Sequence, residues 1–166
     1  FVALLAELVR SALDRFPTSA RESPAVMFTA HSLPVRIRDW GDRYEAELAQ
    51  HCALVAQQAG IGEWRFAWQS AGGTREPWLG PDVLEYLETL QGENIRHVLQ
   101  VPIGFVCDHL EILYDIDIEA KEKARTLGMV LERTELPNAS PAFVQALGNV
   151  VLHQWQSIHH SGAIHV

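Results

Sequence analysis

The fold is decided by Arg96–Arg133, which reads RHVLQVPIGFVCDHLEILYDIDIEAKEKARTLGMVLER. This stretch begins with a short, mostly apolar segment, Arg96–Val101, and ends with a weaker one, Met129–Arg133; we interpret both as strands. Between them, Asp108–Thr126 is interpreted as a helix that Gly128 closes. A strand, a helix and a strand in this order predict a right-handed crossover between parallel strands.

The rest of the chain repeats the same alternation. Strands alternating with helices of this length predict an α/β fold, with a four-stranded, parallel, doubly wound sheet flanked by helices. We expect a single domain over residues 1–166, with residues 157–166 as a frayed tail. The further helices are predicted at Phe1–Phe16, Asp42–Ala59, Pro81–Leu90 and Pro141–Gln156, and the further strands at Ala25–Ala30 and Trp64–Gln69.

Composition excludes several classes of protein. The 166 residues are 48% hydrophobic, which suits a globular domain, and the apolar runs are shorter than the ~20 residues of a membrane span. A net charge of −8 without a Lys/Arg cluster argues against a nucleic-acid partner. Cys52 and Cys107 form no CxxC pair, so we expect a reducing, cytoplasmic setting. Phosphate-binding glycine motifs and the GxSxG motif of serine hydrolases are absent.

Three acids within the central helix need an explanation. Glu111, Asp115 and Glu119 are four residues apart, so they stack along one helix face, where like charges repel. Asp108 and Glu111 have the spacing of a capping box, but this does not account for the two later acids. Either the acids form a solvated face, or they form a track that handles cations.

Polar residues follow three of the predicted strands. His31-Ser32, Gln69-Ser70 and Asp108–Glu111 would all lie at the carboxyl edge of the sheet, where parallel sheets bind ligands. His31 and Glu111 can therefore be neighbours. An imidazole facing carboxylates suits a divalent metal such as Fe²⁺, and it also suits acid–base chemistry, because histidine exchanges a proton near neutral pH.

Each of these residues also has a structural interpretation. His31 can be a hydrogen-bonded loop residue, and Trp78 can cover the core. Cys107 is interpreted as a small buried hydrophobe, and Tyr44 and Cys52 as core positions of a helix. Four histidines near the end of the chain suggest metal binding, but a frayed tail explains them equally: His153, His159, His160 and His165.

Four segments in order form a set of motifs: FTAHSLP (Phe28–Pro34), WQSAGGTREPWLGPD (Trp68–Asp82), VPIGFVCDHLEILYDIDIEA (Val101–Ala120) and LPNASPAF (Leu136–Phe143). Together these segments resemble the carboxyl-terminal half of the ferrochelatases. The resemblance implies a Rossmann-like (chelatase-like) domain that inserts Fe²⁺ into a porphyrin, protoporphyrin IX or coproporphyrin III, in haem biosynthesis. The porphyrin would lie between two similar halves.

The resemblance also implies roles for individual residues. His31 matches the family's active-site histidine, and Glu111 matches the glutamate facing it across the porphyrin. Asp115 and Glu119 match an acidic line that passes metal or protons, so all four residues are expected to contact the metal. The residues expected on the substrate side are Trp78 in the porphyrin wall, Ser70, and the supporting pair Asp108 and His109.

The family's amino-terminal half, which supplies the other wall of the cleft, has no counterpart here. Because the chain has no initiator Met, we expect a fragment lacking an upstream part, with weak or no catalysis alone. No cofactor is expected: iron is the substrate, and two cysteines cannot hold an iron–sulfur cluster. The expected partners are the porphyrin, Fe²⁺ and the missing half, and a peripheral membrane contact stays open. The alternatives are a cobalt or nickel chelatase of a related tetrapyrrole, and a metal- or partner-binding half-module without turnover.

Overall fold

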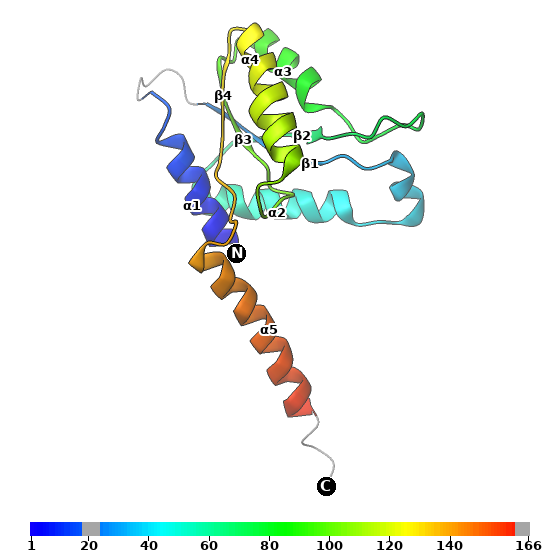
Figure 1. The fold of residues 1–166 in the computed structure, drawn as a ribbon, viewed down its shortest axis with the longest axis vertical. Helices are drawn as coiled ribbons and strands as arrows, with labels where there is room; N and C mark the ends of the chain where they lie inside the picture. The colour runs from blue at the N-terminus through cyan, green and yellow to red at the C-terminus, as the bar shows by residue number, and fades with distance from the viewer. Residues whose placement is uncertain (18–23, 162–166) are drawn as a thin grey trace.

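Four parallel strands in the order β2-β1-β3-β4 form the centre of the protein (Figure 1). The structure is a computed structural model that describes residues 1–17 and 24–161. The observed sheet, with helices on both sides, confirms the predicted α/β class and the predicted four-stranded parallel sheet. The strands are β1 (Ala25–His31), β2 (Arg65–Gln69), β3 (His97–Val101) and β4 (Val130–Arg133).

The strand order creates a switch point between β1 and β3. The chain leaves β1 toward β2 on one side, and it leaves β3 toward β4 on the other side. Connections that diverge in this way open a crevice at the carboxyl ends of the two central strands, which is where such sheets bind ligands. His31 is the last residue of β1, and the chain after Val101, at the end of β3, leads into the acidic helix.

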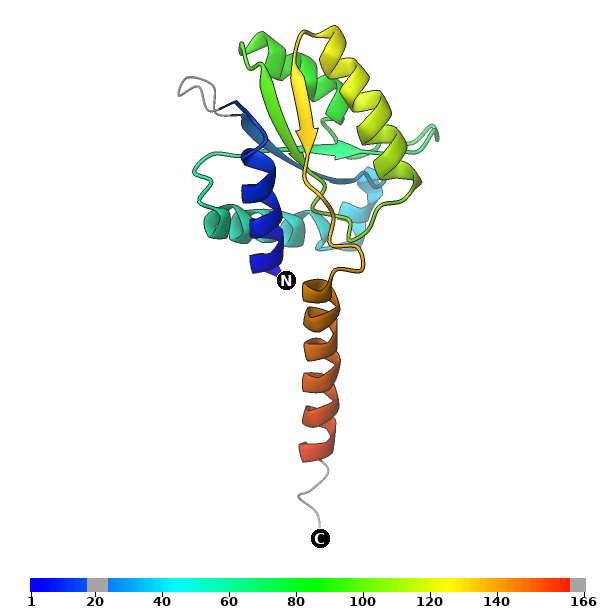
Figure 2. The ribbon, with the colours of Figure 1, turned by 60° about the vertical axis from the view of Figure 1, so that its left-hand side comes forward.

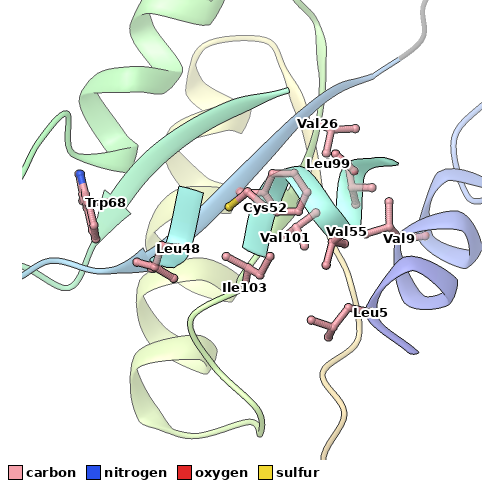
Figure 3. Close-up of a cluster of buried hydrophobic side chains, with 14 of the residues drawn as sticks. Leu5, Val9, Val26, Leu48, Cys52, Val55, Trp68, Leu99, Val101 and Ile103 are labelled. Carbon is pink, nitrogen blue, oxygen red and sulfur yellow. The ribbon is translucent and has the colours of Figure 1, made fainter. Parts of the chain in front are cut away.

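One face of the sheet is covered by α1 (Val2–Leu13) and α2 (Tyr44–Ala59), and Figure 3 shows part of the core between them. The side chains of Val9, Cys52 and Val55 are fully buried there. Burial raises the pKa of the Cys52 thiol to about 12, so this cysteine is a core residue as predicted.

The other face is covered by α3 (Val83–Gly92) and by a continuous helix made of η2 (Ile112–Ala120) and α4 (Lys121–Thr126). Successive strand residues face alternate sides of the sheet, so Met27 packs on this side and Phe28 on the other. The helix is bound to the sheet by a seam of side chains with 0% exposure, four residues apart: Ile112, Ile116, Ala120 and Ala124.

Several predicted boundaries were wrong. Asp82, rather than a residue before Pro81, caps α3: its Oδ1 accepts a hydrogen bond of 2.8 Å from the Leu84 amide.

A short 3₁₀ helix, η1 (Val35–Trp40), occupies a segment for which we predicted no helix. η2 is a π-helix, not an α-helix. Such wide turns often occur at functional sites, and the apolar spacing did not distinguish the two helix types.

The last helix is longer than predicted. α5 (Pro141–Ser161) begins at the predicted proline, and it continues past Gln156, because no Gly or Pro follows until Gly162. Residues 157–161 are therefore helical rather than a frayed tail, while residues 162–166, with His165, lie outside the described residues.

Cys107 is exposed in the loop before the acidic helix, so its assignment to the core was wrong. Within residues 1–17 and 24–161, no helix combines the length and the apolarity needed to cross a membrane.

Gly104 allows the loop after β3 to lie directly against β1. A Cβ atom at Gly104 would lie 2.7 Å from the Ala30 Cβ and 3.0 Å from its Cα, inside normal contact distances. We expect Gly104→Ala to lower the free energy of unfolding by about 1–3 kcal/mol, because the buried end of β1 cannot move away. Urea denaturation measures this change. In the control Gly73→Ala, the new Cβ meets nothing within 4 Å, so an equal loss there would contradict the explanation.

Candidate active site

His31 and Glu111 meet at the switch point of the sheet. The Nδ1 atom of His31, at the end of β1, lies 3.2 Å from the Glu111 Oε2. Glu111 is the residue directly before η2. The side chains are 32% and 42% exposed, so a ligand can reach both. The proximity predicted for these two residues, which are 80 positions apart in the sequence, is confirmed.

The backbone around His31 is held by three hydrogen bonds. The Ser32 amide donates to the Gln69 carbonyl at 2.7 Å, and the buried Ser32 hydroxyl donates to the Leu79 carbonyl at 2.8 Å. The Tyr44 hydroxyl donates to the His31 carbonyl at 2.9 Å. Burial raises the pKa of Tyr44, so its hydroxyl keeps the proton for this bond. The imidazole therefore projects from a fixed backbone.

Ser70 joins the end of β2 to the acidic helix. Its φ of 59° lies in the left-handed region, which is uncommon for a residue other than glycine and recurs at functional sites. The Ser70 hydroxyl donates a hydrogen bond to the Asp115 Oδ2. Ser70, first predicted from its position after a strand, therefore contacts an acid of the predicted track.

Asp115 and Glu119 line one small pocket beside this contact. The pocket has a volume of about 190 Å³, below the roughly 300–1,000 Å³ of pockets that bind drug-sized ligands. It therefore suits an ion with its waters better than a tetrapyrrole. Its walls are Ser70, Ala71, Asp82, Val83, Leu84, Asp115 and Glu119.

Asp117, another acid of the same helix, is neutralised by two basic side chains. Asp117 Oδ2 lies 2.8 Å from Arg133 Nη2, and Asp117 Oδ1 lies 2.9 Å from Lys121 Nζ. Although partial burial opposes ionisation, hydrogen bonds from Arg133 and Lys121 hold the pKa of the Asp117 carboxyl below its ordinary value. In contrast, Asp115 and Glu119 have no Lys or Arg partner in the described part of the chain.

Asp108 and His109 do not contact the reacting pair. Asp108 forms an ion pair of 3.0 Å with Arg133 and accepts a hydrogen bond of 2.8 Å from the Asn138 side chain, instead of capping the helix. The His109 ring packs against Phe105, with the ring centres 5.0 Å apart. In this chain both residues therefore anchor the segment that carries Glu111.

Trp78 is held in the loop that follows β2. Its indole nitrogen donates to the Thr74 hydroxyl at 2.9 Å, and its ring covers Gly72 so closely that a Cβ there would lie 2.5 Å from it. An isolated bridge to Pro34 and a hydrogen bond of 2.9 Å from the Leu79 amide to the Leu33 carbonyl attach this loop to the segment after His31. Trp78 is half-buried, so one part of the ring packs on the loop and another stays accessible.

The roles of three residues at the site were missed from the sequence, although Ser32 had been placed at the correct edge of the sheet. Tyr44 was assigned to the core; its ring does pack there, but its hydroxyl holds His31. Asp82 could have been found, because Asp82 and Glu85 have the capping-box spacing. The buried hydroxyl of Ser32 had no signal in the sequence, because its acceptor belongs to a loop 47 residues away.

The four predicted metal-contacting residues do not form one coordination cluster. Among residues 1–17 and 24–161, no group of three or more His, Cys, Asp or Glu side chains converges in the manner of a metal site. The histidines of α5 are included in this result as far as their side chains are described; His159 stacks on Trp155, with ring centres 4.2 Å apart. The site thus consists of the His31–Glu111 pair and, beside it, the pocket with Asp115 and Glu119.

Comparison with known proteins gives matches of two kinds. The family model named Ferrochelatase matches residues 1–155. A ferrochelatase from Herpetosiphon aurantiacus is 53% identical over 93% of this chain and 50% of its own length. A ferrochelatase from Deinococcus radiodurans is 44% identical over 91% of this chain and 48% of its own length. A coproporphyrin III ferrochelatase from Geobacillus kaustophilus is 42% identical over 93% of this chain and 49% of its own length. The chain thus spans about half the length of these relatives.

A solved structure shows the same fold at low sequence identity. The putative cobalamin biosynthesis protein CbiX from Marinobacter aquaeolei superposes with a TM-score of 0.55 at 15% identity. The match covers 80% of this chain and 98% of that chain. At this identity the similarity establishes the architecture alone.

The ion pair of Asp117 should make the free energy of unfolding depend on pH in the acidic range. Because the pKa of Asp117 is lowered by folding, its stabilisation is present above about pH 4 and is lost as the pH falls through the folded-state value. Asp117→Asn should lower the free energy of unfolding by about 1–3 kcal/mol at neutral pH and remove this part of the acid dependence. Denaturation as a function of pH measures both effects.

The control for this prediction is Asp39→Asn. Asp39 is an exposed acid of η1, so its replacement should change the free energy of unfolding at neutral pH by less than about 0.5 kcal/mol. An Asp117→Asn variant that kept the full acid dependence would show that the pair with Arg133 is not its source.

Proposed function

Since this chain belongs to the ferrochelatase family, as the family model over residues 1–155 shows, we propose that it inserts Fe²⁺ into a porphyrin in haem biosynthesis. Its own part in that reaction is to handle the metal and the protons. The porphyrin is protoporphyrin IX or coproporphyrin III. Iron is the substrate and stays ferrous, so we expect no redox cofactor, and we expect the reaction to take place in the cytoplasm.

The contact between His31 and Glu111 is the observation that carries this proposal. Insertion requires that two pyrrole nitrogens lose their protons and that Fe²⁺ loses its waters. A neutral imidazole can accept a proton, and a carboxylate can replace a water on the ion. At 3.2 Å the two groups also share a hydrogen bond, which holds the imidazole and the carboxylate next to each other. Both act from the same edge of the sheet.

Asp115 and Glu119 extend this site toward solvent. Their negative charges have no basic partner among the described residues, so they favour a cation in the pocket that they line. The acids are spread along η2 instead of converging on one point, an arrangement that can pass an ion onward. We propose that Fe²⁺ and released protons move along this track to and from Glu111. Trp78 would support the porphyrin from the facing loop.

The second wall of the porphyrin cleft would come from another half. The relatives are about twice as long as this chain, and the resemblance assigns the chain to their carboxyl-terminal half. The pocket on this half is too small for a tetrapyrrole. We therefore expect this chain alone to insert iron weakly or not at all.

A metallation assay tests the proposal. This chain is fused to the half of the Herpetosiphon aurantiacus ferrochelatase that it does not match, and insertion of Fe²⁺ is followed by the absorbance of the product with each porphyrin. Glu111→Gln and His31→Ala should lower the rate about 100-fold or more, in the range of a lost acid–base group. The matched control is Glu122→Gln on the same helix, where the acid pairs with Arg125 at 2.7 Å away from the pocket; it should retain the parent rate.

The same assay separates the alternatives. A chelatase for cobalt or nickel would insert Co²⁺ or Ni²⁺ faster than Fe²⁺ under matched conditions. A half-module without turnover would give no insertion in the fusion, although His31→Ala would still weaken metal binding measured by calorimetry. Equal rates for Glu111→Gln and Glu122→Gln would refute the role of the His31–Glu111 pair.

A further inference from the structure

Arg133 binds two parts of the acidic stretch with one guanidinium. It is the last residue of β4, which lies beside the acidic helix (Figure 2). Its Nε atom donates to Asp117 Oδ1 at 3.0 Å, and its Nη2 atom donates to Asp117 Oδ2 at 2.8 Å. The same Nη2 atom lies 3.0 Å from Asp108 Oδ1. The Arg133 side chain is 13% exposed, so solvent screens these charges less than it would at the surface.

These contacts close a loop of the chain around Glu111. Asp108 comes before the acidic helix and Asp117 lies within η2, yet both carboxylates contact the same nitrogen of Arg133. Glu111 lies between the two acids in the sequence, so it is inside the loop that the guanidinium closes. A planar guanidinium that donates two parallel hydrogen bonds fixes the direction of a carboxylate as well as its distance.

Asn138 holds Asp108 from the other side. Its Oδ1 accepts a hydrogen bond of 2.8 Å from the Asp108 amide, and its Nδ2 donates to Asp108 Oδ2 at 2.8 Å. Its own amide donates to the Val106 carbonyl at 2.9 Å. Both carboxylate oxygens of Asp108 are therefore bound. We call this set the Arg133 clamp: Arg133, Asp108, Asp117 and Asn138.

The position of Glu111 depends on the backbone that carries it. Its side chain is 42% exposed, and within the described residues its hydrogen-bond partner is His31. In that part of the chain, the Arg133 clamp shares no residue with the His31–Glu111 contact or with the pocket of Asp115 and Glu119. An effect of the clamp on the reaction therefore has to act through another residue, and Glu111 is the one that the closed loop contains.

We propose that the Arg133 clamp positions Glu111 against His31 for metal insertion, with Arg133 and Asn138 as positioning residues. This role rests on the proposed function, which places Glu111 at the reacting atoms. Misplacing a reacting group by about 1 Å can lower a rate about 100-fold, so a rigid backbone at Glu111 matters for catalysis. The charges of Asp108 and Asp117 are used to hold the chain, while Glu111 stays available to the metal.

An NMR experiment on the complete chain tests the positioning without iron or porphyrin. The ¹⁵N resonances of the His31 imidazole, assigned by comparison with His31→Ala, report the hydrogen bond that the ring makes. Arg133→Lys keeps the positive charge but cannot reproduce the planar fork. We expect it to shift the His31 resonances in the same direction as Glu111→Gln does, because both changes remove the contact. Urea denaturation shows that each variant is folded.

A second variant acts on the other end of the clamp. The φ of Asn138 is 48°, a left-handed value that glycine adopts freely, so Asn138→Gly removes the side chain without straining the backbone. It should shift the His31 resonances in the same direction as Arg133→Lys.

The matched control is Arg125→Lys. Arg125 also donates two hydrogen bonds to one carboxylate, that of Glu122, at 2.9 and 2.7 Å, but this exposed pair lies on α4. The control should leave the His31 resonances unchanged. If Arg133→Lys and Asn138→Gly are folded and also leave them unchanged, the clamp does not position Glu111.

Rates in the fusion with the Herpetosiphon aurantiacus half separate positioning from general damage. Arg133→Lys should lower kcat about tenfold or more and leave KM for the porphyrin unchanged. In the Glu111→Gln background it should have no further effect, because its action passes through Glu111. An equal loss in both backgrounds would refute the proposal. A fusion that inserts no iron refutes the proposed function instead, and the His31 resonances still decide whether the clamp positions Glu111.

Discussion

The seam between the acidic helix and the sheet is the constraint on which the site depends. Ile112, Ile116 and Ala120 are fully buried against the strands, and this burial fixes the rotation of η2 about its axis. Each acid of the track comes directly before one of these residues in the sequence, so each lies at the border between the core and solvent. A rotation of the helix would expose apolar area, at a cost of about 25 cal/mol per Å², so Glu111 stays beside His31 and the two later acids stay at their pocket.

Charge pairing divides the acidic stretch into two groups with different roles. Arg133, at the end of β4, contacts both Asp108 and Asp117, and it thereby ties the start and the middle of the helical segment to the sheet. Asp115 and Glu119 receive no such partner from residues 1–17 or 24–161. The first group therefore stabilises the segment, and the second retains a field that can attract a cation. Acids left without a basic partner in this way are a common property of functional sites.

Much of the fold could be predicted from local pattern. The alternation of strands and helices was sufficient for the parallel sheet, because crossover connections between parallel strands have few alternatives. The position of His31 after one strand and Glu111 after another was sufficient for their proximity, because carboxyl ends of parallel strands share an edge. The failures were local. The start of α3 was misplaced because Pro81 was taken as a helical residue, and the π-helical turns of η2 were missed because apolar spacing resembles that of an α-helix.

By itself, the sequence determined the fold class, the edge of the sheet that carries the site, and the residue types available there, because these depend on periodicity and on the direction of the chain. Tertiary structure decided which residues act together. Tyr44 and Ser32 hold the backbone at His31 through partners distant in the sequence, and Arg133 selects which acids are neutralised. Tertiary structure also decided that large apolar side chains of α5, among them Val151 and Trp155, stay exposed in the described part of the chain. Such pairings depend on distances across the folded chain, and no local pattern encodes them.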